Sequence, residues 1–185
     1  MKRIFLVAVF TGTILTGSKV FGQMVYQQKV WQNSISATIG PNYNGGVDFQ
    51  GMYTLRINAS PFFVSAGYAY GEEKTKISSY DEKNTDPTTA SILQLSGAYS
   101  FFDKLSPAPF NIALFGGFIN VNEKMKIQDN SIVDNNTFGN VFGAHFEWYF
   151  SRNVSLIARQ NFFLLYSSPL GNTRGNTSVG ISVNF

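Results

Sequence analysis

A histidine, a nearby acid and many serines are the residues of this sequence that could carry out hydrolytic chemistry. His145 is the single histidine among 185 residues, and Glu147 follows it two positions later. In catalytic triads, a histidine that is oriented by a carboxylate activates a serine hydroxyl. The sequence has no G-x-S-x-G motif to expose such a serine, and His145 lies only five residues before Phe150, near the end of its predicted strand. We therefore predict that the protein is not an enzyme and has no catalytic residue.

Metal-binding patterns are equally weak. The sequence has no cysteine, which excludes thiolate metal sites and disulfides. Two acidic stretches, Tyr80–Asp86 and Asp129–Asn136, could supply oxygen ligands for Ca²⁺. Counted from Asp134, however, an EF-hand loop would have Phe138 at its fifth position and His145 at its twelfth, where oxygen ligands are needed. We predict that both stretches are solvated loop tips and that the protein binds no metal and no other cofactor.

Polar and apolar residues alternate along much of the chain after residue 33. The alternating segments are 34–39, 54–58, 62–68, 93–96, 110–114, 142–148, 154–159 and 179–185. A period of two residues is typical of β-strands with two unlike faces. We expect eight strands of about 8 to 12 residues, close to the length with which a tilted strand crosses a bilayer.

Two all-β architectures fit this alternation. A soluble sandwich buries its apolar strand faces, whereas a membrane barrel turns them toward lipid and fills its lumen with small or polar groups. The face opposite the apolar one consists here of small residues: Ser65, Gly67, Ser96, Ala98, Ser100, Gly143, Ser178, Gly180 and Ser182. Such groups suit a narrow lumen. The pattern favours an eight-stranded antiparallel up-and-down transmembrane β-barrel over residues 23–185.

The expected connections alternate between short and long. If the chain starts on the periplasmic side, the periplasmic turns are residues 60–61, 103–109 and 151–153. The outward connections are residues 41–48, 72–89, 121–136 and 167–175, with lengths from about 8 to about 18 residues. Outer-membrane barrels have this asymmetry of short periplasmic turns and longer outer loops.

The end of the chain carries a second feature of such barrels. Apolar residues occupy alternate positions up to the terminal aromatic residue: Val179, Ile181, Val183 and Phe185. This pattern resembles the C-terminal signature by which the barrel-assembly machinery recognises outer-membrane barrels, and an ordinary closing strand is the alternative. Aromatic residues also gather near the expected strand ends, as membrane girdles do. They are Phe101, Phe110, Trp148, Phe150 and Phe185 on the periplasmic side, and Tyr68, Tyr70, Phe118 and Tyr166 on the outer side.

Charged residues within the strands all fall on the face that would point into the lumen. They are Arg56, His145, Glu147 and Arg159. A basic side chain on the lipid face would cost roughly 2–4 kcal/mol near the midplane. Glu147 and Arg159 lie on strands joined by a short turn, which places them opposite or diagonal to each other. We predict an interior polar network whose charges neutralise one another and fix the strand register; a substrate or proton site is the alternative.

The first 22 residues have the organisation of an export signal. A basic start at Lys2 and Arg3 precedes a mostly apolar run, and small residues come before a predicted cleavage at Gln23. A transmembrane anchor is the alternative, but Thr11 to Thr13 interrupt a run that is already short for a spanning helix. We predict a signal peptide over residues 1–22 and localisation in the outer membrane.

Removal of this segment changes the charge of the protein. The whole chain has 14 Lys and Arg against 11 Asp and Glu, but Lys2, Arg3 and Lys19 belong to the predicted signal. The mature chain therefore has 11 basic and 11 acidic residues. The basic character of the whole chain therefore comes from the predicted signal, and direct nucleic-acid binding loses its main support.

Several segments resemble a known family. The stretches Leu95–Ser106 (LSGAYSFFDKLS) and Phe115–Glu123 (FGGFINVNE) resemble the conjugative transposon protein TraO family of Bacteroidota. Phe142–Ser151 and the final GISVNF strand fit the second half of that family, so the resemblance covers the chain from about Phe62 to its end. It implies a small outer-membrane component of a conjugative DNA-transfer apparatus, with no catalytic residue to carry over.

The predicted partners follow from these features. They are outer-membrane lipid, the barrel-assembly machinery and other proteins of the conjugation apparatus, without direct contact to nucleic acid. The alternative is a generic small outer-membrane barrel that acts in surface adhesion or binding through its long outer loops.

Overall fold

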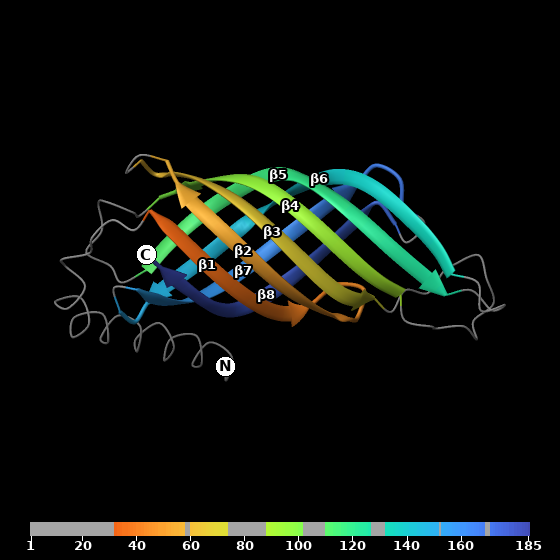
Figure 1. Cartoon of the computed structure of the whole chain (residues 1–185), viewed down its shortest axis with the longest axis horizontal. Helices are drawn as coiled ribbons and strands as arrows, with labels where there is room; N and C mark the ends of the chain where they lie inside the picture. Colours follow the sequence, from red (N-terminus) through yellow and green to blue (C-terminus); the bar gives the residue numbers. More distant parts are fainter. Residues whose placement is uncertain are drawn as a thin grey trace, which may run out of the picture.

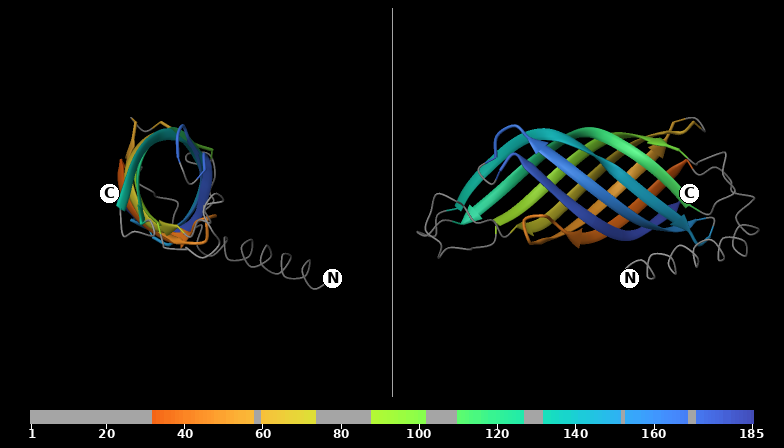
Figure 2. Two further views of the ribbon diagram at one scale, coloured as in Figure 1. Left: turned by 90° about the vertical axis from the view of Figure 1, so that its right-hand side faces the viewer. Right: turned by 180° about the vertical axis from the view of Figure 1, so that it is seen from behind.

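The chain folds into one closed sheet. The computed structural model describes residues 32–57, 60–73, 88–101, 110–126, 132–151, 153–168 and 171–185. They form eight strands: β1 (Asn33–Pro41), β2 (Val47–Arg56), β3 (Phe62–Glu73), β4 (Thr88–Ser100), β5 (Phe110–Lys126), β6 (Ile132–Tyr149), β7 (Val154–Leu165) and β8 (Thr173–Asn184). Each strand pairs antiparallel with the next, and β8 pairs with β1, so the sheet closes into a barrel (Figures 1 and 2). This confirms the predicted eight-stranded antiparallel barrel. The predicted signal peptide lies outside the described residues, and no helix among the described residues is long and apolar enough to cross a membrane.

The last strand closes the barrel against the first. Ile35 lies opposite Val183 and Ile39 lies opposite Val179 in the β1–β8 ladder. At the end of the ladder, Asn33 and Phe185 exchange two backbone hydrogen bonds of 3.0 and 2.9 Å. The alternating residues of the predicted assembly signature therefore form the closing seam, with their side chains on the outside. Their recognition by the assembly machinery stays a prediction.

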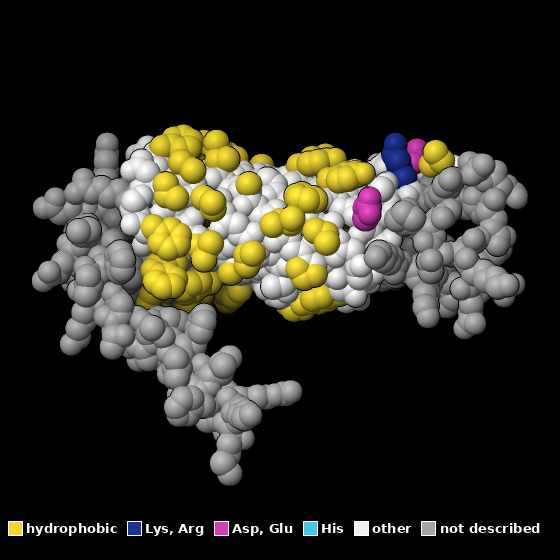
Figure 3. Space-filling view, turned by 90° about the horizontal axis from the view of Figure 1, so that it is seen from below, with side chains coloured by type: hydrophobic (Ala, Val, Ile, Leu, Met, Phe, Trp, Pro, Cys, Tyr) yellow, Lys and Arg dark blue, Asp and Glu magenta, His cyan; other side chains and the backbone are white. Residues whose placement is uncertain are grey.

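The outer wall of the barrel is apolar. Leu93, Phe118 and Ile181 are 58%, 69% and 57% exposed, whereas polar residues such as Gln50 and Ser96 are buried inside. Figure 3 shows hydrophobic side chains spread along one side of this wall, with acidic and basic ones gathered near one end. Exposing such a wall to water would cost about 25 cal/mol per Å² of apolar surface. The arrangement requires a lipid environment and excludes the soluble sandwich.

Side chains fill the lumen. The interior contains many small polar side chains and one apolar cluster, which includes Phe63, Phe115 and Phe163. Gly143 faces this cluster, and a Cβ there would come within 2.6 Å of the Phe115 ring and 2.0 Å of the Gln160 carbonyl oxygen. Small inward residues thus leave room for the interior rings. An eight-stranded barrel is just wide enough to be filled in this way.

Two strands are much longer than the sequence predicted. β5 has 17 residues and β6 has 18, against the expected 8 to 12, and they take up most of the predicted 121–136 loop. The acidic stretch 129–136 is accordingly not only a loop tip, because its second half belongs to β6. Most outward-facing residues here are polar, with Ile132 as the exception, so the sequence loses its polar–apolar alternation although the strands continue. The cross-strand hydrogen bond from Asn120 to Asn136 (2.7 Å) and the direct opposition of Lys124 and Asp134 support this extension.

The outer end of the barrel is oblique. We use "outer end" for the end with the β1–β2 and β5–β6 connections, following the predicted sidedness. β1 and β2 turn early through residues 42–46, where Gly45 has a positive φ of 84°, while β5 and β6 project well beyond them (Figure 1). One side of the rim therefore stands above the other.

Candidate functional site

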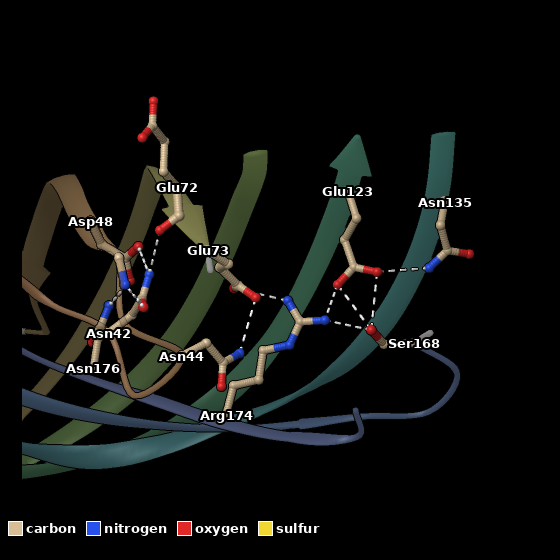
Figure 4. Close-up of polar contacts among 11 residues, drawn as sticks. Asn42, Asn44, Asp48, Glu72, Glu73, Glu123, Asn135, Ser168, Arg174 and Asn176 are labelled. Carbon is tan, nitrogen blue, oxygen red and sulfur yellow. Dashed lines mark hydrogen bonds and ion pairs between the residues drawn. The ribbon is translucent and has the colours of Figure 1, made fainter. Parts of the chain in front are cut away.

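A buried ion-pair cluster lies at the outer end of the lumen. Arg174 of β8 forms one ion pair with Glu73 of β3, at 2.9 Å from Nη1 to Oε1, and a second with Glu123 of β5 through Nη2 (Figure 4). All three side chains are at most 6% exposed. Neither β3 nor β5 is next to β8 in the sheet, so the guanidinium bridges the lumen. We call Glu73, Glu123, Ser168 and Arg174 the outer-mouth cluster.

Further donors satisfy the two carboxylates. Ser168 Oγ donates to Glu123 at 3.0 Å, and Asn135 Nδ2 donates to Glu123 Oε2 at 2.9 Å. Asn44 Nδ2, from the β1–β2 turn, donates to Glu73 Oε2 at 3.0 Å. Buried carboxylates are tolerated when they are paired with a cation and accept further hydrogen bonds, as both do here. The cluster therefore joins β3, β5, β6, β8 and two outer connections across the mouth.

A second polar group lies beside the cluster, around Asp48. Asn42 Nδ2 donates to Asp48 Oδ1 at 2.9 Å, and Asn176 Nδ2 donates to Oδ2 at 2.7 Å. Asn161 Nδ2 extends the chain by donating to Asn176 Oδ1 at 2.5 Å. These bonds tie the β1–β2 turn to β7 and β8. Together the two groups fill the outer mouth with three carboxyl groups, one guanidinium and several amides (Figure 4).

The residues of the predicted interior network lie in the other half of the lumen. Arg56 is buried near the periplasmic end, where its Nε donates to the Ser60 carbonyl at 2.8 Å and its guanidinium lies 5.3 Å from the Phe63 ring centre. Arg159 is also buried, with its guanidinium 5.2 Å from the Phe115 ring centre. Both guanidinium groups thus pack on interior aromatic faces, a favourable cation–π geometry.

Glu147, His145 and Arg159 share one small cavity. Its volume is about 10 Å³, at the lower limit for a cavity that holds one water molecule. His145 lies directly opposite Arg159 in the β6–β7 ladder and stacks on Phe115, with ring centres 6.4 Å apart. Glu147 lies opposite Ile157, which makes it the diagonal neighbour of Arg159.

The direct contacts of Glu147 are with hydroxyl groups. Tyr149 Oη donates to it at 2.9 Å, and Ser155 Oγ donates to its second oxygen. Glu147 and Arg159 therefore face the same cavity without a direct ion pair. Their coupling across the cavity stays a prediction, and so does the absence of catalysis. Among the described residues, no group of three His, Asp or Glu is arranged to hold a metal ion.

Sequence reasoning missed the outer-mouth cluster. Glu73, Glu123 and Arg174 all fell within predicted outer loops, but they belong to strands and point inward. Their positions in the sequence did indicate an inward direction. Glu73 is an even number of residues from the inward-facing Ser65, and Arg174 is an even number from the inward-facing Ser178. Counting every second residue beyond the apolar segment of each strand would have identified them as inward-facing.

The fold, the apolar wall and the filled lumen define a small transmembrane β-barrel of the outer-membrane type. The chain matches no protein-family model and no curated protein. It is similar in structure to a major outer membrane protein from Thermus thermophilus (11% identity, TM-score 0.64, 85% of this chain and 100% of that chain). It is also similar to Neisserial surface protein A (18%, 0.60, 83% and 95%) and to Ail, the attachment invasion locus protein of Yersinia pestis (12%, 0.54, 83% and 97%), the latter in complex with a heparin analogue. At these identities the likeness shows the fold that they share.

The outer-mouth cluster predicts a specific loss of stability. Arg174→Ala leaves two buried carboxylates facing each other, so we expect the free energy of unfolding to fall by about 3 kcal/mol or more. Lys124→Ala is the matched control, because Lys124 follows Glu123 on the same strand but is exposed on the outer face; we expect a change within about 0.5 kcal/mol. Urea unfolding of the barrel in lipid vesicles measures both. Equal effects would contradict the assignment.

The shared cavity predicts coupling between Glu147 and Arg159. Glu147→Ala should lower the free energy of unfolding. The double variant with Arg159→Ala should lose less stability than the sum of the two single variants, because the second change removes the charge left unpaired by the first. The control pair is Glu147→Ala with Arg174→Ala, at opposite ends of the lumen, which should add within about 0.5 kcal/mol. A double-mutant cycle in urea measures this. Strict additivity of the first pair would show that the two groups do not interact.

Proposed function

We propose that the protein is a closed outer-membrane barrel that binds other proteins of a conjugative DNA-transfer apparatus at its outer rim. The observation that carries the docking role is the outer-mouth cluster. It crosses the lumen with fully buried charges and leaves the rim, not a channel, as the surface available to partners. Transport of solutes or nucleic acid through so narrow a barrel is disfavoured.

Several features support placement in the outer membrane. The barrel is closed by a strand that ends in the alternating residues Val179 to Phe185, and its outer wall is apolar. The predicted contrast between short periplasmic turns and long outer connections is not general in the structure, because β5 and β6 take up most of the predicted 121–136 loop and the β4–β5 connection is longer than the β1–β2 connection. Residues 1–22 have the composition of an export signal. Exported by that signal and inserted by the barrel-assembly machinery, the mature chain has lipid on its wall and partners at its rim.

The choice of conjugation rests on the family resemblance. The stretches 95–106 and 115–123 resemble TraO proteins. Residues 95–100 of the first stretch lie at the end of β4, and the second stretch lies within β5, including the base of the projecting hairpin. The neutral mature chain argues against direct handling of DNA. The role is therefore structural: a rigid anchor in the outer membrane for proteins that build the transfer apparatus.

A second candidate is surface adhesion. The observation that favours it is the height of the β5–β6 hairpin, which raises polar residues above the apolar wall. Ail, which shares the fold, has been crystallised with the heparin analogue sucrose octasulfate. In this alternative the same rim would contact a host or environmental surface instead of a transfer protein.

Gene deletion separates the two functions. A clean deletion in the donor strain should lower conjugation frequency and leave growth and envelope integrity unchanged, because a docking barrel serves the apparatus and not the membrane. Complementation with the intact gene should restore transfer, whereas a variant with a shortened β5–β6 hairpin and a folded barrel should not. Mating assays measure this. Normal transfer together with lost surface adhesion would select the second candidate.

A further inference from the structure

The strand β6 has an unpaired edge above the membrane. Its ladder with β5 extends to the pair Ile132–Lys126, but its ladder with β7 stops at the pair Gly139–Leu165. The last contacts on the β7 side are Tyr166 N to the Phe138 carbonyl at 3.0 Å and Ser167 N to Thr137 Oγ1 at 3.2 Å. Residues 132–136, which we call the β6 edge, therefore have a strand neighbour on one side only (Figure 2).

The direction of the free backbone groups follows from the ladder. The Phe138 carbonyl points toward β7, and backbone groups in a strand point to the same side at every second residue. The N–H and C=O groups of Ile132, Asp134 and Asn136 thus point toward the open side. In the described chain no segment accepts or donates to them. They present donors and acceptors about 7 Å apart, the repeat of a β-ladder.

The β6 edge lies in water and is held rigid. Apart from Ile132, the outward-facing residues at its level are polar: Asn120, Asn122, Lys124, Asp134 and Asn136. β5 supports the whole segment from behind, and Asn135 is fixed by its bond to Glu123 of the outer-mouth cluster. A preorganised strand loses little conformational freedom when a partner binds.

The β6 edge also has few of the features that normally prevent another strand from pairing with an exposed edge. Natural edges are protected by proline, lysine or bulges, and residues 132–136 (IVDNN) contain no proline or lysine. The one charge, Asp134, lies directly opposite Lys124, which offsets it. An open edge of this kind is a template for strand addition.

We infer that the β6 edge binds an extended segment of a partner protein, which adds to the sheet as a further strand through backbone hydrogen bonds. This inference deepens the proposed docking role and rests on it for the nature of the partner. Strand addition takes its affinity from the main chain and its selectivity from alternate side chains. Here those side chains would meet Ile132, Asp134 and Asn136 on the outer face.

A second copy of the chain does not fit this edge. Two barrels inserted in the same direction are related by an axis along the membrane normal, and strands in such barrels tilt by about 35–45° from that axis. Their β6 edges would cross at roughly 70–90°, whereas a ladder needs nearly parallel or antiparallel strands. The occupant must be a segment whose direction the membrane does not fix.

Photo-crosslinking in intact donor cells tests the inference. The full-length protein carries p-benzoylphenylalanine in place of Ile132, Asp134 or Asn136, one site at a time, and adducts are mapped by mass spectrometry. We expect all three sites to label one segment of one partner, with the labelled residues two apart from site to site. Scattered adducts, no adduct, or adducts only with a second copy would overturn the inference.

A backbone substitution provides the matched control. Asp134→Pro removes one open-side N–H and no bond to β5, whereas Asp134→Ala removes the side chain and keeps the N–H. With the crosslinker at Asn136, the adduct should be lost in Asp134→Pro and kept in Asp134→Ala, while both barrels keep heat-dependent gel mobility. Equal adducts in both variants would overturn strand addition. Adducts at sites two residues apart on a protein outside the transfer apparatus would refute the conjugation role but support strand addition. Loss of DNA transfer on gene deletion, without any adduct, would support the conjugation role but refute strand addition.

Discussion

In a lipid bilayer every backbone N–H and C=O needs a hydrogen-bond partner within the protein, and this constraint governs the whole structure. No water is present to satisfy an open strand edge, so the sheet must close on itself. The exchange between Asn33 and Phe185 completes that closure, and eight strands fix the width of the lumen. Above the apolar wall the constraint no longer holds, since water is available. The one long unpaired edge in the described part of the chain, residues 132–136, lies in that region.

Closure also determines what the interior must do. A narrow lumen excludes bulk water, so the polar residues that alternate with the lipid-facing ones have to satisfy one another. At the outer mouth, Arg174 pairs with Glu73 and Glu123, and two asparagine amides donate further hydrogen bonds to these carboxylates. In the other half, hydroxyls serve Glu147 while aromatic rings face Arg56 and Arg159. The interior is thus a filled and unusually polar core. Because it leaves no channel, we infer that partners bind at the rim.

The sequence predicted the parts of the fold that lie against lipid. In β2 and β8 most outward residues beside the lipid are apolar, such as Phe49, Leu55 and Ile181, so polar–apolar alternation marks the strand. That signal ends where outward residues become polar, as at Asn120 and Asn122, and the pattern therefore predicts a loop for the upper halves of β5 and β6. Parity alone indicated that Arg56, Glu147 and Arg159 face inward. Which groups they meet depends on strand tilt and on distances across the barrel, and local pattern does not carry that information. The bridge from Arg174 to β3 and β5 shows this most clearly, because it joins residues about 50 and 100 positions apart.

Conductance in planar lipid bilayers tests the central claim that buried charges close the lumen. The wild-type barrel, purified and shown to be folded by its heat-dependent gel mobility, should give no steady current under applied voltage. Removing the guanidinium that bridges the outer mouth with Arg174→Ala should leave this half of the lumen less ordered and raise the frequency of brief openings. A stable, ohmic single-channel conductance from the wild-type protein would contradict the account, because it would show a continuous water path where the structure has ion pairs.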